Sequence, residues 1–234
     1  GGPGVPGDLE LLLRATWPLL QSHNSGVIVA VANLHLDLGP GGAHPRIARA
    51  LTFAVRTSRQ SCHFVLLDAI ASMVQRAPAL FADRIGAFFI KSVDPTPIRT
   101  IKLKILAQLA TADNVDRVLV ELQAYIRTGE PGFVASVIET IGEATAAVPK
   151  IRKRALATLQ ILAGHPSPAV ATRAVGVIVA TVAPKPWDNY KVVRKLLQRY
   201  EALEPAAKAD VLWVALSHLP GRGEAAAAAD EPAE

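Results

Sequence analysis

Residues 94–106 read DPTPIRTIKLKIL, and this stretch holds the signals that decide the fold. An acidic residue before proline is typical of a helix start. Its side chain can accept a hydrogen bond from a free helix N–H, and proline at the first position gives up an N–H that had no partner. Ile98, Ile101 and Ile105 then recur at steps of 3 and 4 along one helix face. The stretch predicts an amphipathic helix over 95–111, with Lys102 and the other cations on its remaining faces.

Similar helix-start signals recur along the chain. They occur at intervals of 36, 34, 36, 37 and 37 residues, beginning at Asn24, Gln60, Asp94, Glu130, Ser167 and Glu204. A period of this size with two helices per unit is typical of an α-solenoid, in which each repeat packs on its neighbours. The sequence therefore predicts an all-α fold, an α-solenoid of about six HEAT/armadillo-like helix pairs.

Twelve helices are expected in these pairs. The first helices of the pairs are predicted at 8–20, 45–57, 81–90, 115–127, 150–163 and 190–200. The second helices are predicted at 25–38, 61–77, 95–111, 131–148, 168–183 and 205–218. Because the second helices are the more apolar ones, we expect their layer to be the more buried.

Composition narrows the class of protein. Hydrophobic residues make up 50% of the 234 residues and aromatic residues only 5%, as expected for helix-on-helix packing. Cys62 is the single cysteine, which excludes an internal disulfide and indicates a reducing compartment. The longest uncharged run, 15–36, contains Pro18 and Gly26, so it predicts two short helices and a turn instead of a membrane span.

Three segments are expected along the chain. Residues 1–7 are interpreted as a disordered leader or the edge of a longer protein. Residues 8–219 are interpreted as the solenoid, with a flexible turn at 39–42. Residues 220–234 have no apolar stripe and are interpreted as a disordered acidic tail or the start of a hinge.

Several strings of helix residues, in colinear order, resemble the trunk of the β-adaptins. They are WPLLQS at 17–22, FFIKSVDPTPI at 88–98, ELQAYIR at 121–127, FVA at 133–135 and IETIG at 138–142. The Asp-Pro-Thr and Tyr-Ile-Arg variants are most similar to the β chain of adaptor-protein complex three. The resemblance covers roughly 8–219 and departs from the family at 212–218, where LWVALSH lacks the usual Gly-Glu-Tyr ending.

The resemblance implies a structural, non-enzymatic subunit of a heterotetrameric vesicle-coat adaptor complex. Such complexes act in intracellular protein transport and sort membrane cargo to lysosome or vacuole-type organelles. The implied partners are the medium chain, a second large chain and a small chain, with peripheral membrane association through the complex. The implied location is the cytoplasm, on the cytosolic face of Golgi, endosomal or vesicle membranes.

The sequence offers no catalytic, cofactor-binding or metal-binding residues. Cys62 and His63 are adjacent on a predicted helix, point about 100° apart and cannot form a dyad, even with Asp68 nearby. The six histidines lack the i, i+4 pairing of a helical metal site. Trp17 and Trp213 lie within apolar runs, so both are expected in the core.

Two groups of basic residues are candidates for a partner contact. They are Lys150, Arg152, Lys153 and Arg154 at a predicted helix start, and Lys191, Arg194, Lys195 and Arg199, with Lys185, one repeat later. Cations are disfavoured at a helix N-terminus, so the first group needs compensation from acids such as Glu139 or Glu143, or from a partner. One interpretation is a solvated face with local ion pairs. The other is a contact with an acidic subunit surface or an anionic lipid headgroup.

Two other functions stay open at this point. Net charge of +5 permits a helical-repeat nucleic-acid-binding protein that uses the basic groups as a stripe. Two features argue against nucleic acid as a partner: the aromatic platforms of RNA-binding modules are missing, and 20 acidic residues are interspersed with the 25 basic ones. A DNA glycosylase on a HEAT-like scaffold is the other, but it needs an acid, an aromatic platform and cations in one cleft. The three tryptophans, Trp17, Trp187 and Trp213, are far apart in sequence and therefore far apart in a solenoid.

Overall fold

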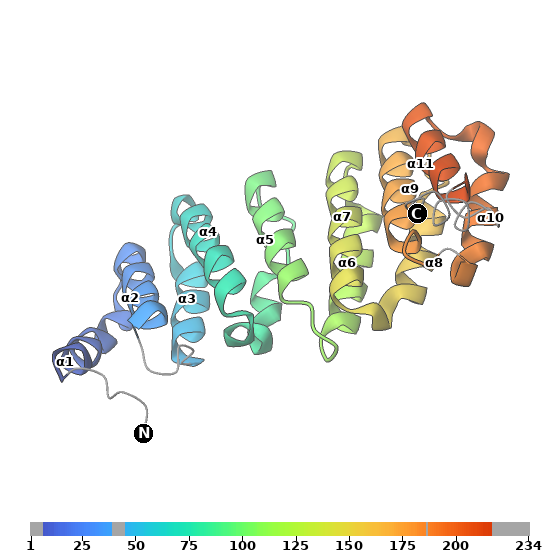
Figure 1. The fold of residues 1–234 in the computed structure, drawn as a ribbon. Helices are drawn as coiled ribbons and strands as arrows, with labels where there is room; N and C mark the ends of the chain where they lie inside the picture. Colours follow the sequence, from blue (N-terminus) through green and yellow to red (C-terminus); the bar gives the residue numbers. More distant parts are fainter. Residues whose placement is uncertain (1–6, 39–44, 186, 217–234) are drawn as a thin grey trace, which may run out of the picture. The chain divides into compact units, whose positions relative to one another are not determined.

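A computed structural model describes residues 7–38, 45–185 and 187–216. Across those residues the chain forms eleven α-helices and six 3-10 segments, and no strand. Figure 1 follows these elements along the chain from blue to red. The turn predicted at 39–42 and the tail predicted at 220–234 lie outside the described residues.

The chain divides into two compact units, 1–114 and 115–234. In the first unit three helix pairs follow one another, and the two members of each pair contact one another. Its elements are α1 (Gly7–Thr16), η1 (Trp17–Gln21), α2 (Ser25–Leu38), α3 (Pro45–Thr57), α4 (Gln60–Arg76), η2 (Pro78–Leu80), η3 (Ala82–Phe88) and α5 (Thr96–Gln108).

The second unit contains three further helix pairs. Within it, α7 packs on α9 and α9 packs on α11, so the second helices form a layer of their own. Its elements are α6 (Val115–Thr128), α7 (Pro131–Ala147), η4 (Pro149–Ile151), α8 (Arg152–Leu162), α9 (Pro168–Val182), η5 (Trp187–Asn189), α10 (Tyr190–Gln198), η6 (Tyr200–Ala202) and α11 (Pro205–Leu216).

The second-helix layer is the more buried one at α9 and α10, as predicted, whereas α3 and α4 bury six side chains each. On α9 six side chains are buried, from Val170 to Val182, whereas α10 buries Leu196 alone. Close approach between α7 and α9 occurs at Gly142, where an added Cβ would lie 2.7 Å from Cγ1 of Val177. Only a residue without a side chain fits there, which explains a glycine at the end of the IETIG string.

Eleven of the twelve predicted helices are α-helices in the structure, and the segment predicted at 81–90 is not. It is covered by the 3-10 segment η3. Pro78 and Gly86 weaken an α-helix in this region. Phe81 and Phe88 are both fully buried and contact one another edge to face, with ring centroids 6.2 Å apart. Burial of both rings takes precedence over regular helix geometry here.

Lys102 was expected on a polar face of its helix, and that prediction is wrong. The side chains of Lys102 and Asp94 are only 6% and 10% exposed, and Nζ of Lys102 donates to Oδ2 of Asp94 over 2.6 Å. The same ammonium donates to the carbonyl of Phe89 over 3.3 Å, and Asp94 also accepts from the backbone N–H of Lys91 over 2.8 Å. The cation is buried because the preceding loop supplies its partners.

Arg99 completes the bonding of this loop. Its Nε donates to the carbonyl of Asp94 over 2.7 Å, and its Nη2 donates to the carbonyl of Ser92 over 3.0 Å. Side chains of α5 therefore satisfy the carbonyl groups of the loop that leads into it. This arrangement gives a structural reason for the DPTPIRTIK string.

The helix-start signals place the helices correctly, and the predicted side-chain capping is seen at Asn24. There Oδ1 accepts from the backbone N–H of Gly26 over 2.9 Å. Pro95, Glu130 and Ser167 occupy the N-cap positions of their helices without a side-chain hydrogen bond. Asp94 stands one residue too early and turns to Lys102, and the Glu130 side chain is longer than those preferred at N-caps.

The prediction that both tryptophans lie in the core is wrong for Trp213, which is 59% exposed. It lies on α11, whose apolar residues surround the helix without a clear stripe, so only part of them can face α9. Trp17 is half-buried and contacts His35 edge to face at 4.8 Å between ring centroids.

Candidate interaction surfaces

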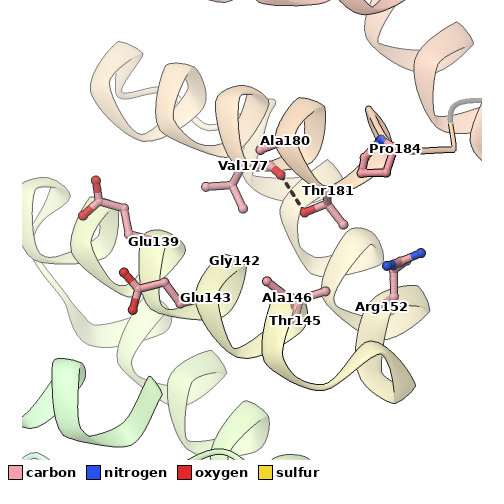
Figure 2. A pocket seen from close by; sticks show the side chains of 10 residues that line it. All are labelled: Glu139, Gly142, Glu143, Thr145, Ala146, Arg152, Val177, Ala180, Thr181 and Pro184. Atoms are coloured by element: carbon pink, nitrogen blue, oxygen red, sulfur yellow. Dashed lines mark hydrogen bonds between the residues drawn. The ribbon is translucent and has the colours of Figure 1, made fainter. Parts of the chain in front are cut away.

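A hollow of about 630 Å³ opens in the second unit between α7 and α9. Small side chains form much of its lining: Gly142 and Ala146 of α7, and Ala180 of α9 beside Val177. Figure 2 shows the two carboxylates Glu139 and Glu143 toward one end of the view, and Arg152 with Pro184 toward the other. The lining is therefore apolar in the middle and charged, with opposite signs, at its two ends.

The side chain of Arg152 lies on a different side of the molecule from those of Lys150 and Arg154, its neighbours in sequence. It is half-buried at the start of α8 and lines the α7–α9 hollow. Its Nε is buried and, among the described residues, has no hydrogen-bond partner. Sequence position alone grouped Arg152 with its neighbours, whereas helical geometry turns it toward the second-helix layer.

A second hollow of about 1040 Å³ lies nearer the N-terminal end of α9, on the side of α11. It shares Val177 and Ala180 with the first hollow, and Gly176 keeps its lining open. Glu204 and Asp210 contribute carboxylates from the α11 side. We refer to the two together as the α9 hollows.

An ion pair ties the helices together beside these hollows. Nη1 of Arg173 on α9 lies 2.9 Å from Oε1 of Glu139 on α7, with both side chains about half exposed. The α9 hollows thus have a floor of small residues and a rim that carries both charges. Such a surface can hold a segment of another protein, because it admits close backbone approach and offers charged groups for orientation.

The first basic group makes local ion pairs on the first-helix layer. Lys150 lies 3.4 Å from Asp116 of α6, and Arg154 also bonds to Asp116. The compensating acid is therefore Asp116, not Glu139 or Glu143 as suggested from sequence. Lys153 is exposed between them.

The second basic group lies on α10 and borders α8. Nζ of Lys195 donates to the side-chain carbonyl of Gln160 over 3.3 Å, and the guanidinium of Arg199 lies against Gly164. Lys191 and Arg194 are exposed, as is Lys185 before the helix. The two groups, except Arg152, therefore lie on α8 and α10 or on the residues directly beside these helices. Ile161 of α8 is 77% exposed.

Cys62 and His63 are adjacent on α4 and were not expected to form a dyad. Cys62 is half-buried, and the Nε2 atom of His63 lies 3.1 Å from the carbonyl oxygen of Ser58. Over the described ranges, no three His, Cys, Asp or Glu residues are grouped so that they could hold a metal ion. Nor is any helix in those ranges long and apolar enough to cross a membrane.

Sequence reasoning missed one further surface, which we call the α3 face: Arg49, Phe53 and Arg56, all exposed on α3. Phe53 is 63% exposed. Steps of 4 and 3 place the three residues on one side of the helix. The spacing of these three residues can be read from the sequence, but only the apolar stripe on the other side of the helix was considered there.

Comparison with known proteins agrees with the resemblance to the β-adaptins noted in the sequence. Residues 5–218 match the family described as "Adaptin N terminal region". The chain is 34% identical over 208 residues to "AP-3 complex subunit beta-2" of Mus musculus and 32% identical over 171 residues to "AP-3 complex subunit beta" of Dictyostelium discoideum. These matches cover 88% and 73% of this chain, but only 19% and 15% of the relatives.

A structural comparison supports the fold. The chain matches a structure titled "Homology model of the full-length AP-3 complex in an intermediate open conformation" with a TM-score of 0.72 and 24% sequence identity. The match covers 88% of this chain and 35% of that one. The α-solenoid fold class predicted from the sequence is confirmed.

Proposed function

The chain belongs to the adaptin family, and we propose from this premise that it is a trunk segment of the β subunit of a vesicle-coat adaptor complex similar to AP-3. The observation that carries the proposal is the match to AP-3 β subunits over 88% of the chain. The chain spans about a fifth of the length of these relatives, 19% in each case. The proposal therefore concerns one segment of a larger subunit.

The segment would act by geometry, without catalysing a reaction. Paired helices hold a layer of second helices in place, and the α9 hollows present small residues between charged groups. We propose that this layer holds the medium chain, while the second large chain and the small chain complete the complex. Sorting of membrane cargo then follows from how the assembled subunits are positioned, with no residue of this segment touching a sorting signal.

Location follows from the same proposal. The complex would act on the cytosolic face of Golgi, endosomal or vesicle membranes and direct cargo to lysosome or vacuole-type organelles. The segment 8–219 would form part of the trunk, and 220–234 would be either an acidic tail or the start of a hinge.

The exposed basic residues of the first-helix layer fit a protein partner. Lys153, Lys191 and Arg194 are exposed, while Asp116 of neighbouring α6 already pairs with Lys150 and Arg154. Because both charges occur side by side, this layer suits another subunit with an acidic patch better than a uniformly anionic surface. Lys195 and Arg199, which lean on α8, would contribute less.

Co-expression with the medium chain of the AP-3 complex tests the proposal. We expect the two chains to co-purify and to remain associated as salt is raised, because a buried apolar contact is insensitive to screening. A parallel titration with duplex DNA and single-stranded RNA should show no tight binding. Steeply salt-dependent nucleic-acid binding without retention of the medium chain would overturn the proposal. Crosslinking of a sorting-signal peptide to this segment would contradict the absence of cargo contact.

A further inference from the structure

The facing sides of α8 and α10 are held in a fixed register. Nζ of Lys195 donates to the side-chain carbonyl of Gln160 over 3.3 Å, and the guanidinium of Arg199 lies against Gly164. Both contacts join residues that are 35 positions apart, and the second contact lies one turn beyond the first on each segment. The two helices therefore run side by side in the same direction.

Three cations follow the side of α10 that faces α8. Lys191, Lys195 and Arg199 recur at steps of four, which places them along one side of a helix, and all three are exposed. The bond to Gln160 fixes the Lys195 ammonium without neutralising it, because an amide oxygen carries no net charge. A rise of about 1.5 Å per residue separates successive cations by about 6 Å along the axis. We call these three residues the α10 row.

The neighbouring ridge of α8 is apolar over its second half. Lys153, Ala157 and Ile161 are exposed and also recur at steps of four. Ile161 is 77% exposed, and the register places it between the levels of Lys195 and Arg199. An aliphatic side chain thus stands beside a row of positive charge. A segment that binds here can bury apolar surface and pair its own charges at the same time.

The acids closest in sequence leave most of the α10 row without a carboxylate. Between Glu143 and Glu201 the only acidic residue is Asp188, which is exposed just before α10. It precedes Lys191 by three residues, so it can neutralise only that end of the row. Glu143 lines the α7–α9 hollow, and Glu201 lies 3.9 Å from Lys208.

The two acids of α6, on the other side of α8, are bonded elsewhere or turned away. Asp116 is bonded to two cations of the first basic group. Glu121 lies two positions before Gln123, which donates to Thr158 of α8 over 2.7 Å. Two positions correspond to about 200° around a helix, so Glu121 points away from α8. The α8 ridge and the α10 row together therefore carry excess positive charge.

An extended acidic peptide matches these two ridges. Every second residue of an extended chain lies about 6.5–7 Å further on, close to the spacing of the α10 row. Alternate side chains of such a chain point to opposite sides, so carboxylates can face the α10 row while aliphatic side chains face Ala157 and Ile161. A nucleic-acid strand supplies the negative charge but no aliphatic side chain, and Asp188 beside Lys191 disfavours a continuous anionic surface.

We propose that the α8–α10 face binds an extended acidic segment of a partner protein in which carboxylates alternate with aliphatic side chains. The face consists of Lys153, Ala157 and Ile161 of α8 together with the α10 row. The inference rests on the proposal that the first-helix layer meets a protein, and it adds the chemistry that this layer recognises. It needs no contact at the α9 hollows, so retention of the medium chain is a separate property.

Fluorescence anisotropy of the full chain with labelled peptides tests the inference. The probe is a peptide of alternating Glu and Leu, compared with Gln-Leu and Glu-Ser peptides of the same length. We expect saturable binding of the Glu-Leu peptide, about tenfold tighter than that of either comparison peptide, because both charge pairing and apolar burial are needed.

Two variants of the face separate these contributions. Ile161→Gln should bind the Glu-Leu peptide about tenfold more weakly and leave binding of the Glu-Ser peptide unchanged. Each exposed ion pair changes affinity by up to about fivefold, so the Lys191→Gln, Lys195→Gln double variant should weaken both acidic peptides by about tenfold. Lys191 should contribute the larger part, because Lys195 is already bonded to Gln160.

Matched controls lie in the first unit. Val65→Gln replaces an aliphatic residue of α4 that is 65% exposed, and Arg14→Gln with Lys104→Gln removes two exposed cations. These controls should bind the Glu-Leu peptide like the parent chain, and thermal unfolding should be unchanged in all variants. Equal losses in the controls, no saturable binding by the parent chain, or tighter binding of single-stranded RNA or phosphatidylserine vesicles than of the peptide would overturn the inference.

Co-expression with the medium chain distinguishes this inference from the proposed function. The Ile161→Gln chain should still retain the medium chain, because the α9 hollows are unaltered. Retention of the medium chain by a parent chain that binds no peptide would overturn the inference alone. Peptide binding without retention of the medium chain would support the inference and count against the proposed assembly.

Discussion

The loop before α5 and the outer face of α8 both contain ion pairs, yet the two regions use charge in opposite ways. Asp94 and Lys102 are almost fully buried and share additional bonds with the loop backbone. Asp116, Lys150 and Arg154 are about half exposed and bond to one another across the surface. Buried charge holds the loop before α5, whereas exposed charge in the second unit stays accessible to a partner.

The largest expected effect comes from Lys102→Met. The substitution leaves the Asp94 carboxylate buried without its cation, and breaking such a pair costs about 3–5 kcal/mol. Urea unfolding of the full chain, followed by circular dichroism, measures the loss. The Asp94→Asn, Lys102→Met double variant should recover part of it, because the amide oxygen can still accept from Lys91 without a charge. A loss below about 1 kcal/mol for Lys102→Met would show that the pair does not hold the loop.

Close packing, not charge, fixes the second-helix layer, and a pair of glycines tests this. Gly142→Ala should destabilise the chain by about 1–3 kcal/mol, since the new Cβ would overlap Val177. Gly176→Ala should be neutral or stabilising by up to about 1 kcal/mol, because the nearest atom, Oδ2 of Asp210, lies 3.7 Å away. The midpoints of thermal unfolding compare the two variants, and equal midpoints would contradict the close approach of α7 and α9.

Arg99→Ala should have an intermediate effect on the loop before α5. It removes two charge-assisted hydrogen bonds to the carbonyls of Asp94 and Ser92, at a cost of about 1–3 kcal/mol. Arg99→Lys should restore only part of this, because an ammonium lacks the forked geometry. Amide hydrogen exchange over 89–95 provides the measurement. Unchanged exchange rates in Arg99→Ala would mean that the loop is held by Lys102 alone.

Asp116→Asn should have the smallest effect. Exposed ion pairs contribute about 0–1 kcal/mol and are screened by salt. The difference from the parent chain in unfolding free energy should therefore vanish near 1 M sodium chloride. A larger loss of unfolding free energy that persists at high salt would mean that Asp116 stabilises the fold as the buried Asp94 does, and the contrast between the two regions would not hold.

Helix positions could be predicted from the sequence because they depend on local signals. Pro45–Thr57 and Ser25–Leu38 were predicted with the bounds that the structure has, from apolar spacing and helix-start signals alone. The 3-10 segment around Phe81 and Phe88 was missed although Pro78 and Gly86 disfavour an α-helix there. What the sequence does not show is that both rings are buried and contact one another. Lys102 was misplaced for a related reason: its partner Asp94 lies outside the helix.

The candidate surfaces were only partly accessible from sequence. The basic residues were found, but adjacency in sequence placed Arg152 with Arg154, although the two face different layers. The α9 hollows could not be predicted because they arise between helices that are far apart in sequence. The exposed position of Phe53 was overlooked because the apolar stripe of α3 is that of an ordinary amphipathic helix, and the opposite side was not considered.

Hydrogen exchange of the chain with and without the AP-3 medium chain tests the central claim most directly. The account predicts new protection on α7, α9 and α11, where the hollows lie, and unchanged exchange over 89–102, where the bonds are already internal. Protection confined to 89–102, or no change on α9 in a mixture shown to associate, would contradict the claim that this layer holds the partner.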